Sequence, residues 1–210
     1  MQNSPSGKPL TTKVYTMATS TDEIVGFLQA EGIKFRRDED GDVLTGFKTD
    51  VYRDRGGDLG VPILIHLVED GEYIEVMTPR AYSCKDSPHL GTVLQALLMT
   101  SWFTKLVQFE YNWNDGEIRA IVEFPLEDAK LTQRQLMRCV RGLAQILDTY
   151  HPMITGAIER GVIELPESRK QERALHDALA ANGGDRAALM GEFAAFLARR
   201  GQGRGVELED

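Results

Sequence analysis

The stretch EYNWNDGEIRAIVEFPLED (residues 110–128) constrains the fold more than any other part of the chain. Apolar and polar side chains alternate on both sides of Asn114-Asp115-Gly116, a pattern typical of two antiparallel strands joined by a tight turn. Alternating side chains point to opposite faces of a sheet, so one face of this hairpin is apolar and the other polar. Ile121 is the one apolar residue predicted on the polar face.

The register follows from the turn. Hairpin loops of residues 115–116 or of residues 114–117 both pair Trp113 with Ile118. The same register pairs Tyr111 with Ala120 and places both tyrosine and alanine on the apolar face. We therefore expect Tyr111 in the core. We expect Trp113 at the rim, where a core lining becomes a partner surface; Tyr73 is a further aromatic candidate for partner binding.

The other elements predict an α+β fold in which helices pack on an antiparallel sheet. Ser20 or Thr21 can cap a first helix, and Thr132 with Gln135 forms a capping box for a later one. Pro152 predicts the end or a kink of that later helix, or one further turn through Ile158. The predicted order is helix (21–32), strands (33–38, 43–49, 61–68 and 72–78), helix (from Ser87), two hairpin strands, and helix (132–150).

The helix that starts at Ser87-Pro88 has an unusually broad apolar face. A face of this width exceeds what one sheet usually covers. We favour a central core helix; the alternative is that part of the face packs on a second subunit. The candidate residues of a dimer interface are Leu90, Leu94, Leu97, Leu98 and Trp102.

The sequence divides into four parts. Residues 1–19 predict a flexible N-terminal tail, and residues 20–162 form the α+β domain. Residues 163–201 contain two alanine-rich segments joined by Asn-Gly-Gly, which predicts an appended helical hairpin. Residues 202–210 predict a disordered tail.

The charge distribution disfavours some partners. The chain carries a net charge of −8, and an acidic body repels phosphate backbones, so direct nucleic-acid binding is not expected. A basic partner protein would be attracted, although negative charge also simply keeps proteins soluble. No apolar run is long enough for a membrane helix, and the first twenty residues lack a signal core, which predicts a cytoplasmic protein.

No motif indicates catalysis, a cofactor or a metal. Asp38, Asp40 and Asp42 have the spacing that opens a calcium loop, but the glycine and glutamate of that loop are missing, so an acidic turn is predicted. The four histidines are scattered, and Cys84 and Cys139 are expected to be reduced thiols. An enzyme that assembles distant residues remains a third hypothesis.

Two segments carry a family resemblance: VLQALLMTSWFTKLVQFEYNWNDGEIRAIVEFPLED and LTQRQLMRCVRGLAQILDTYHPMI. With the element order, they make residues 20–160 resemble the YbjN family of bacterial sensory transduction regulators, which is similar in fold to type III secretion chaperones. The resemblance implies an acidic, non-catalytic and commonly dimeric protein that holds another protein. It implies no family-wide functional residue.

The leading hypothesis is therefore a homodimeric chaperone or adaptor that holds a partner protein through apolar patches. Its client is expected to be basic, including proteins that themselves handle nucleic acid. The alternative is a regulatory module that senses a small ligand.

Overall fold

The computed structural model describes residues 18–127, 129–181 and 191, and it confirms the α+β class. A six-stranded antiparallel sheet has the strand order β1-β2-β3-β4-β6-β5. The strands are β1 (Phe35–Arg37), β2 (Val43–Phe47), β3 (Val61–Val68), β4 (Tyr73–Ser83), β5 (Gln108–Tyr111) and β6 (Glu117–Pro125). The helices of the described part are α1 (Thr21–Ala30), α2 (Leu90–Phe103), α3 (Gln133–Arg160) and α4 (Glu167–Ala181), with a short 3-10 turn, η1, at Glu69–Gly71.

The helix boundaries follow from their caps. The Ser20 hydroxyl accepts the Glu23 N–H and the Glu23 carboxylate accepts the Ser20 N–H, so both halves of a capping box are present at α1. Thr132 and Gln135 form the same arrangement at α3, as predicted. Gly161 ends α3 in the left-handed conformation. Pro152 does not end the helix, which continues to Arg160.

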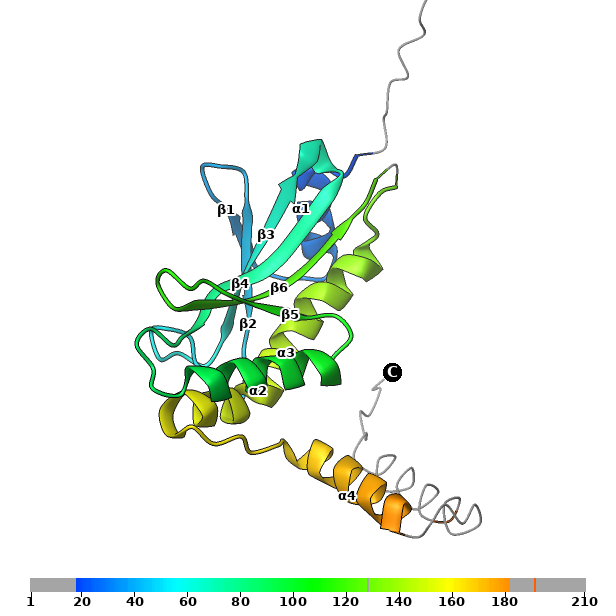
Figure 1. The fold of residues 1–210 in the computed structure, drawn as a ribbon. Helices are drawn as coiled ribbons and strands as arrows, with labels where there is room; N and C mark the ends of the chain where they lie inside the picture. The colour runs from blue at the N-terminus through cyan, green and yellow to red at the C-terminus, as the bar shows by residue number, and fades with distance from the viewer. Residues whose placement is uncertain (1–17, 128, 182–190, 192–210) are drawn as a thin grey trace, which may run out of the picture.

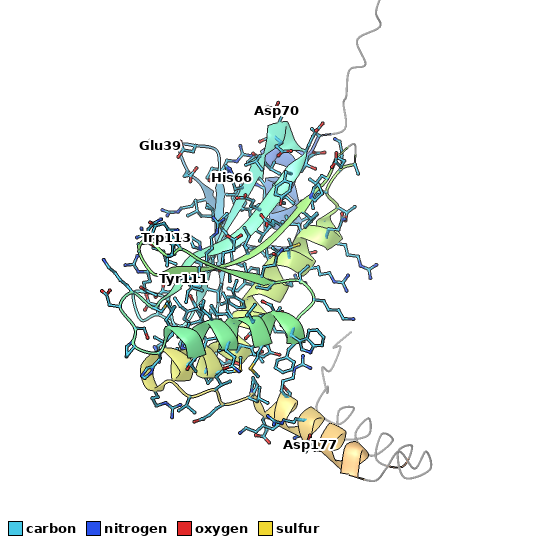
Figure 2. All side chains as sticks on the ribbon, in the orientation of Figure 1. Glu39, His66, Asp70, Tyr111, Trp113 and Asp177 are labelled. Atoms are coloured by element: carbon cyan, nitrogen blue, oxygen red, sulfur yellow. The ribbon has the colours of Figure 1, made fainter. Side chains whose placement is uncertain are left out.

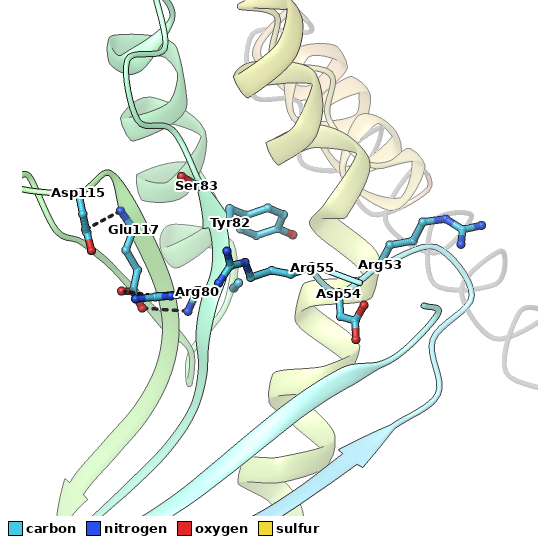
Figure 3. Close-up of a pocket in the computed structure, with 9 residues that line it drawn as sticks. Arg53, Asp54, Arg55, Arg80, Tyr82, Ser83, Asp115 and Glu117 are labelled. Atoms are coloured by element: carbon cyan, nitrogen blue, oxygen red, sulfur yellow. Dashed lines mark hydrogen bonds and ion pairs between the residues drawn. The ribbon is translucent and has the colours of Figure 1, made fainter. Parts of the chain in front are cut away.

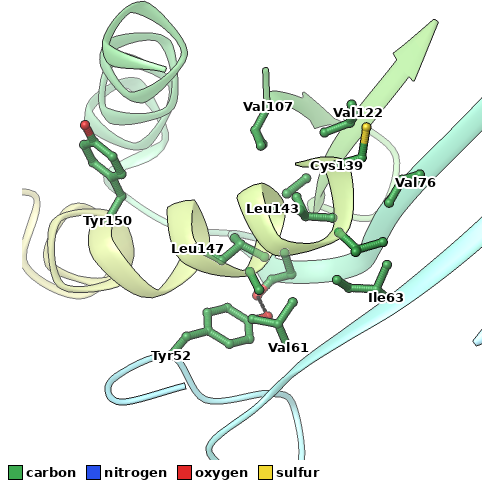
Figure 4. Packing of buried hydrophobic residues seen from close by; sticks show 14 of the residues in the cluster. Tyr52, Val61, Ile63, Val76, Val107, Val122, Cys139, Leu143, Leu147 and Tyr150 are labelled. Atoms are coloured by element: carbon green, nitrogen blue, oxygen red, sulfur yellow. Dashed lines mark hydrogen bonds between the residues drawn. The ribbon is translucent and has the colours of Figure 1, made fainter. Parts of the chain in front are cut away.

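The helix α3 forms the centre of the core. It packs against β3, β4, β6, α1 and α2, and in Figure 1 it lies behind the sheet. Leu143 and Leu147 are fully buried and lie near Val61, Ile63 and Val76 of the sheet (Figure 4). Burying each such side chain contributes about 1.5–3 kcal/mol to stability.

The interpretation of α2 as the central core helix is wrong. It packs beside α3 and against β5, and only one of its sides is buried, through Val93, Ala96, Leu97 and Thr100. The opposite side carries Leu98 and Trp102, which are 72% and 87% exposed. The apolar face of α2 is wider than the surface that α3 and β5 cover, and Leu98 and Trp102 are therefore left exposed.

The sheet face opposite the helices has its own apolar patch. Met77 pairs with Ile121 across β4 and β6, and both are buried, yet neither belongs to the core cluster on the helical side. Leu64 is the next cross-strand neighbour of Met77. Ile121, predicted as the apolar exception on the polar face, is thus placed as expected.

The two ends of the described chain differ in how they attach. Thr19, which the sequence assigns to the tail, is buried; its N–H donates to Gly71 O at 3.1 Å and its hydroxyl accepts the Leu131 N–H at 2.8 Å. At the other end, α4 corresponds to the first helix of the predicted hairpin and extends away from the body (Figure 1). The second helix of that hairpin, most of the N-terminal tail and the C-terminal tail lie outside the described residues.

Candidate functional site

The outward side of α2 carries no charged residue. The helix reads LGTVLQALLMTSWF, without a single Asp, Glu, Lys or Arg, in a protein with 27% charged residues. Its exposed positions are Gly91, Gln95, Leu98 and Trp102, which lie on one side of the helix because they are three or four residues apart. We call these four residues the α2 outer face. A solvent-facing helix side ordinarily carries charges, so this one is typical of a contact surface.

The structure sorts the five predicted dimer-interface residues into two groups. Leu97 is buried and Leu90 packs against the core, so these two stabilise the fold. Leu94 is half-buried, beside Leu98 and Trp102, which are exposed. These three do not pack in the core cluster and are therefore available for contact with a second molecule.

The C-terminal end of α2 is joined to α4. The Arg169 guanidinium lies 5.0 Å from the centre of the Phe103 ring, in cation–π geometry. Its Nε donates to the Tyr150 hydroxyl at 3.0 Å and its Nη2 donates to the Phe103 carbonyl at 2.8 Å. Beside this junction lies a pocket of about 330 Å³ that Ile146 and Lys105 also line.

The predicted register of the β5–β6 hairpin is wrong by two residues. Tyr111 pairs with Ile118, and Phe109 pairs with Ala120. The loop is residues 113–116, because Asn112 N–H donates to Glu117 O at 2.8 Å and Gly116 N–H donates to Asn112 O at 2.9 Å. Gly116, at φ +74°, occupies the last loop position, as a four-residue loop built on a type I turn requires.

This register changes the position of Trp113 but not the face of Tyr111. A shift of two residues preserves the alternation, and Tyr111 packs half-buried against the core. Trp113 lies in the loop and is 79% exposed, so it lines no core (Figure 2).

Tyr73 lies on the other side of the sheet. It alternates with the buried Ile74 and Val76 along β4 and therefore faces away from the helices. Burial and the neighbouring Glu123 carboxylate raise the pKa of its hydroxyl. The three predicted partner-binding residues thus occupy a loop, the helical face and the helix-free face, and they do not form one groove.

Residues 50–60, which lie between two of the predicted strands, are attached to α3. Asp148 accepts the backbone N–H groups of Val51 at 2.7 Å, Tyr52 at 2.8 Å and Asp50 at 3.2 Å. Burial opposes ionisation of Asp148, but these three N–H groups outweigh it and hold the pKa of the carboxyl below its usual value.

Next to this attachment, the buried Tyr52 and Tyr82 and the half-buried His151 form an aromatic cluster. Tyr82 stacks on His151 with ring centres 5.8 Å apart, and its hydroxyl lies 3.3 Å from His151 Nδ1. The Tyr52 hydroxyl donates to Ala81 O at 3.1 Å. Burial raises the pKa of Tyr52 to about 12 and lowers the pKa of His151, so both groups are neutral at pH 7.

Above this cluster is a pocket of about 310 Å³, and sequence reasoning missed its residues. Arg53, Asp54 and Arg55 line it from the 50–60 segment, and Arg80 lines it from β4; of the two segment arginines, Arg55 is the one that extends toward β4 (Figure 3). The signal that could have found Arg80 is Pro79, because proline inside a strand run marks a bulge.

The remaining candidates for chemistry are structural. Asp38 accepts the N–H groups of Asp40 and Asp42, which makes the predicted acidic turn between β1 and β2. Cys84 and Cys139 are both free and buried, and burial raises the pKa of the Cys139 thiol to about 11. Across the described residues, no group of three or more His, Cys, Asp or Glu side chains is placed to hold a metal ion.

No protein-family model matches the chain, and no curated protein matches its sequence. In the described part of the chain, no helix is both long enough and apolar enough to cross a membrane.

Proposed function

We propose that this protein is a non-enzymatic adaptor or chaperone that holds a partner protein, and that two copies pair through the α2 outer face. The observation that carries the proposal is Trp102, 87% exposed on a helix side that has no charge. Tryptophan is the residue type most enriched among the energetic centres of protein interfaces, whereas charged residues are depleted there.

Pairing of two copies suits this surface better than contact with a charged partner. A two-fold symmetric interface places the same residues against each other, so its centre has to be self-complementary. Leu98 and Trp102 meet this condition, because apolar side chains pack against their own copies without leaving a charge unpaired. The half-buried Leu94 extends the same apolar strip by one helical turn.

The client would bind elsewhere on the pair. Trp113 lies in the β5–β6 loop, outside α2, and is the second strongly exposed tryptophan. The net charge of −8 favours a basic client in the cytoplasm and disfavours direct binding to nucleic acid or an anionic membrane. The family resemblance of residues 20–160 supports the same chaperone-like role.

Light scattering on size-fractionated protein tests the pairing. At micromolar concentration we expect twice the 23.4 kDa mass of one chain. Trp102→Glu should yield single chains, because pairing would bury two unpaired carboxylates. Trp113→Glu is the matched control, since it makes the same chemical change at an exposed tryptophan outside α2. A single-chain mass for the unchanged protein, or an unchanged mass for Trp102→Glu, would contradict the proposal.

Affinity purification from the native cells tests the client. The Trp113→Glu variant should no longer co-purify with the client. The Trp102→Glu variant, which is expected to be a single chain, should still co-purify with part of it. Recovery should fall as salt is raised, because salt screens the attraction between an acidic surface and a basic client. Equal recovery at low and high salt would argue against electrostatic capture.

A further inference from the structure

The pocket beside the Tyr52–Tyr82 cluster lies between a turn that positions Arg55 and a strand bulge that positions Arg80. Its volume of about 310 Å³ is at the small end of the range for small-molecule sites, and too small for a folded partner. One wall is the 50–60 segment, and the other is the end of β4 together with Asp115 and Glu117 of the hairpin.

A closed turn holds Arg55. The Asp54 carboxylate accepts the N–H groups of Gly56 at 2.8 Å and Asp58 at 3.0 Å, and Asp54 N–H donates to Asp58 O at 3.0 Å. Arg53 donates to Gly57 O at 2.7 Å and so braces the same turn. In Figure 3 the Arg55 side chain extends toward β4, whereas Arg53 extends the other way.

A bulge in β4 presents Arg80. The register of β4 against β6 shifts between Thr78 and Tyr82, and Arg80 within this bulge has φ +50°. A non-glycine residue in this region costs stability, which fits a position where the side chain has a role. Glu117 accepts the Arg80 N–H at 2.9 Å and lies 3.5 Å from the Arg80 guanidinium, so it holds the bulge in place.

Three arginines and three carboxylates line the pocket, so its formal charge is zero, but each carboxylate already accepts hydrogen bonds from the protein. Asp54 is engaged by its turn, Glu117 by Arg80, and Asp115 by the Glu117 N–H at 3.0 Å. Arg55, in contrast, forms no ion pair or side-chain hydrogen bond with any residue that the structure describes. Its guanidinium is left with unused donors in the pocket that Arg80 also lines.

We propose that Arg55 and Arg80 form a binding site for the oxyanion group, carboxylate or phosphate, of a small ligand. The planar guanidinium offers paired donors that match either oxyanion, and the exposed Ser83 hydroxyl lies in the same pocket. The protein as a whole repels anions, so affinity comes from these local donors and not from long-range attraction. The site is independent of the proposed pairing through α2, which lies outside it.

Isothermal titration of the full-length protein with sodium phosphate and with sodium citrate, at ionic strength fixed with chloride, tests this site. We expect saturable binding of at least one probe. Arg55→Gln should weaken it about tenfold or more, the range for loss of a hydrogen bond to a charged group. Tighter binding of phosphate would indicate a phosphorylated ligand, and tighter binding of citrate a carboxylic acid.

Two further variants keep the result interpretable. Arg80→Asn removes the second guanidinium with a residue type that tolerates positive φ, and it should weaken binding at least as much. Arg138→Gln removes the same charge from the exposed surface of α3 and should leave binding unchanged. Absence of saturable binding by both probes, full binding by Arg55→Gln, or an equal loss in Arg138→Gln would overturn the proposal.

Discussion

Asp148 Oδ1 accepts the backbone N–H of Tyr52 at 2.8 Å across 96 residues of sequence. This contact, with its neighbours at Val51 and Asp50, attaches the 50–60 segment to α3. The attachment fixes the position of the 50–60 segment. That segment contributes Tyr52 to the aromatic cluster with Tyr82 and His151, and it contributes Arg55 to the arginine pocket.

Asp148→Asn should destabilise the protein by about 1–3 kcal/mol, because backbone N–H groups lose a charged acceptor. The folded-state pKa of Asp148 lies below its unfolded value, so its contribution is complete above the unfolded pKa. That contribution is lost as pH falls through the folded pKa. Urea unfolding at several pH values should therefore show the difference from the unchanged protein shrinking in acid, below the usual carboxyl range. If the difference in unfolding free energy stayed constant with pH, the charge of Asp148 would not be what holds the 50–60 segment.

Gly116→Ala should destabilise the hairpin. A Cβ there would lie 2.4 Å from Lys85 N, in a residue at φ +74°, and such strain costs roughly 1–3 kcal/mol. Gly91→Ala is the contrasting change, since its Cβ meets nothing within 4 Å on a helix. It should stabilise by up to about 0.5–1 kcal/mol. Thermal unfolding of both variants measures the change in stability. Equal changes in the two variants would contradict the loop conformation described for Gly116.

Arg169→Ala should release the start of α4 from the body. The lost contacts include those with the Phe103 ring, the Phe103 carbonyl and the Tyr150 hydroxyl, and cation–π stacking alone contributes about 0.5–2 kcal/mol. Limited proteolysis should then cleave faster between α3 and α4. Lys170→Ala is the control, because the Lys170 side chain makes, among the residues that the structure describes, only an exposed ion pair with Glu167, 3.4 Å away. Equal cleavage of both variants would show that Arg169 does not anchor the helix.

Tryptophan fluorescence can report pairing directly, because Trp102 and Trp113 are the only two tryptophans. In Trp113→Phe the remaining emission comes from Trp102, and dilution should shift it to longer wavelength as the buried ring becomes exposed. In Trp102→Phe the remaining emission should not change on dilution. A dilution shift in the second variant and none in the first would place the interface at the hairpin loop instead.

How far the sequence predicted the structure depends on the range of the contacts involved. The faces of the β5–β6 hairpin were predictable because alternation is local. The register was not, since Gly116 suits the second position of a two-residue loop (115–116) and the last position of a four-residue loop (113–116) equally. The α3 cap was predictable from Thr132 and Gln135, which are neighbours in sequence.

The candidate sites were harder to predict. Exposure of Trp102 depends on how much of α2 its neighbours cover, which hydrophobic periodicity alone does not give. The arginine pocket depends on Asp148 meeting residues 50–52 and on a bulge that brings Arg80 toward Arg55. Neither contact leaves a pattern in local sequence apart from Pro79.

The absence of charge from α2 determines how ionic strength should act on the protein. Two copies that each carry −8 repel one another, while an interface of Gly91, Gln95, Leu98 and Trp102 has no ion pair for salt to weaken. At physiological salt the screening length is about 8 Å, so added salt removes repulsion between the bodies and leaves apolar contact intact. Pairing through α2 should tighten as salt is raised, whereas capture of a basic client should loosen, so the salt concentration alone shifts the balance between the two associations.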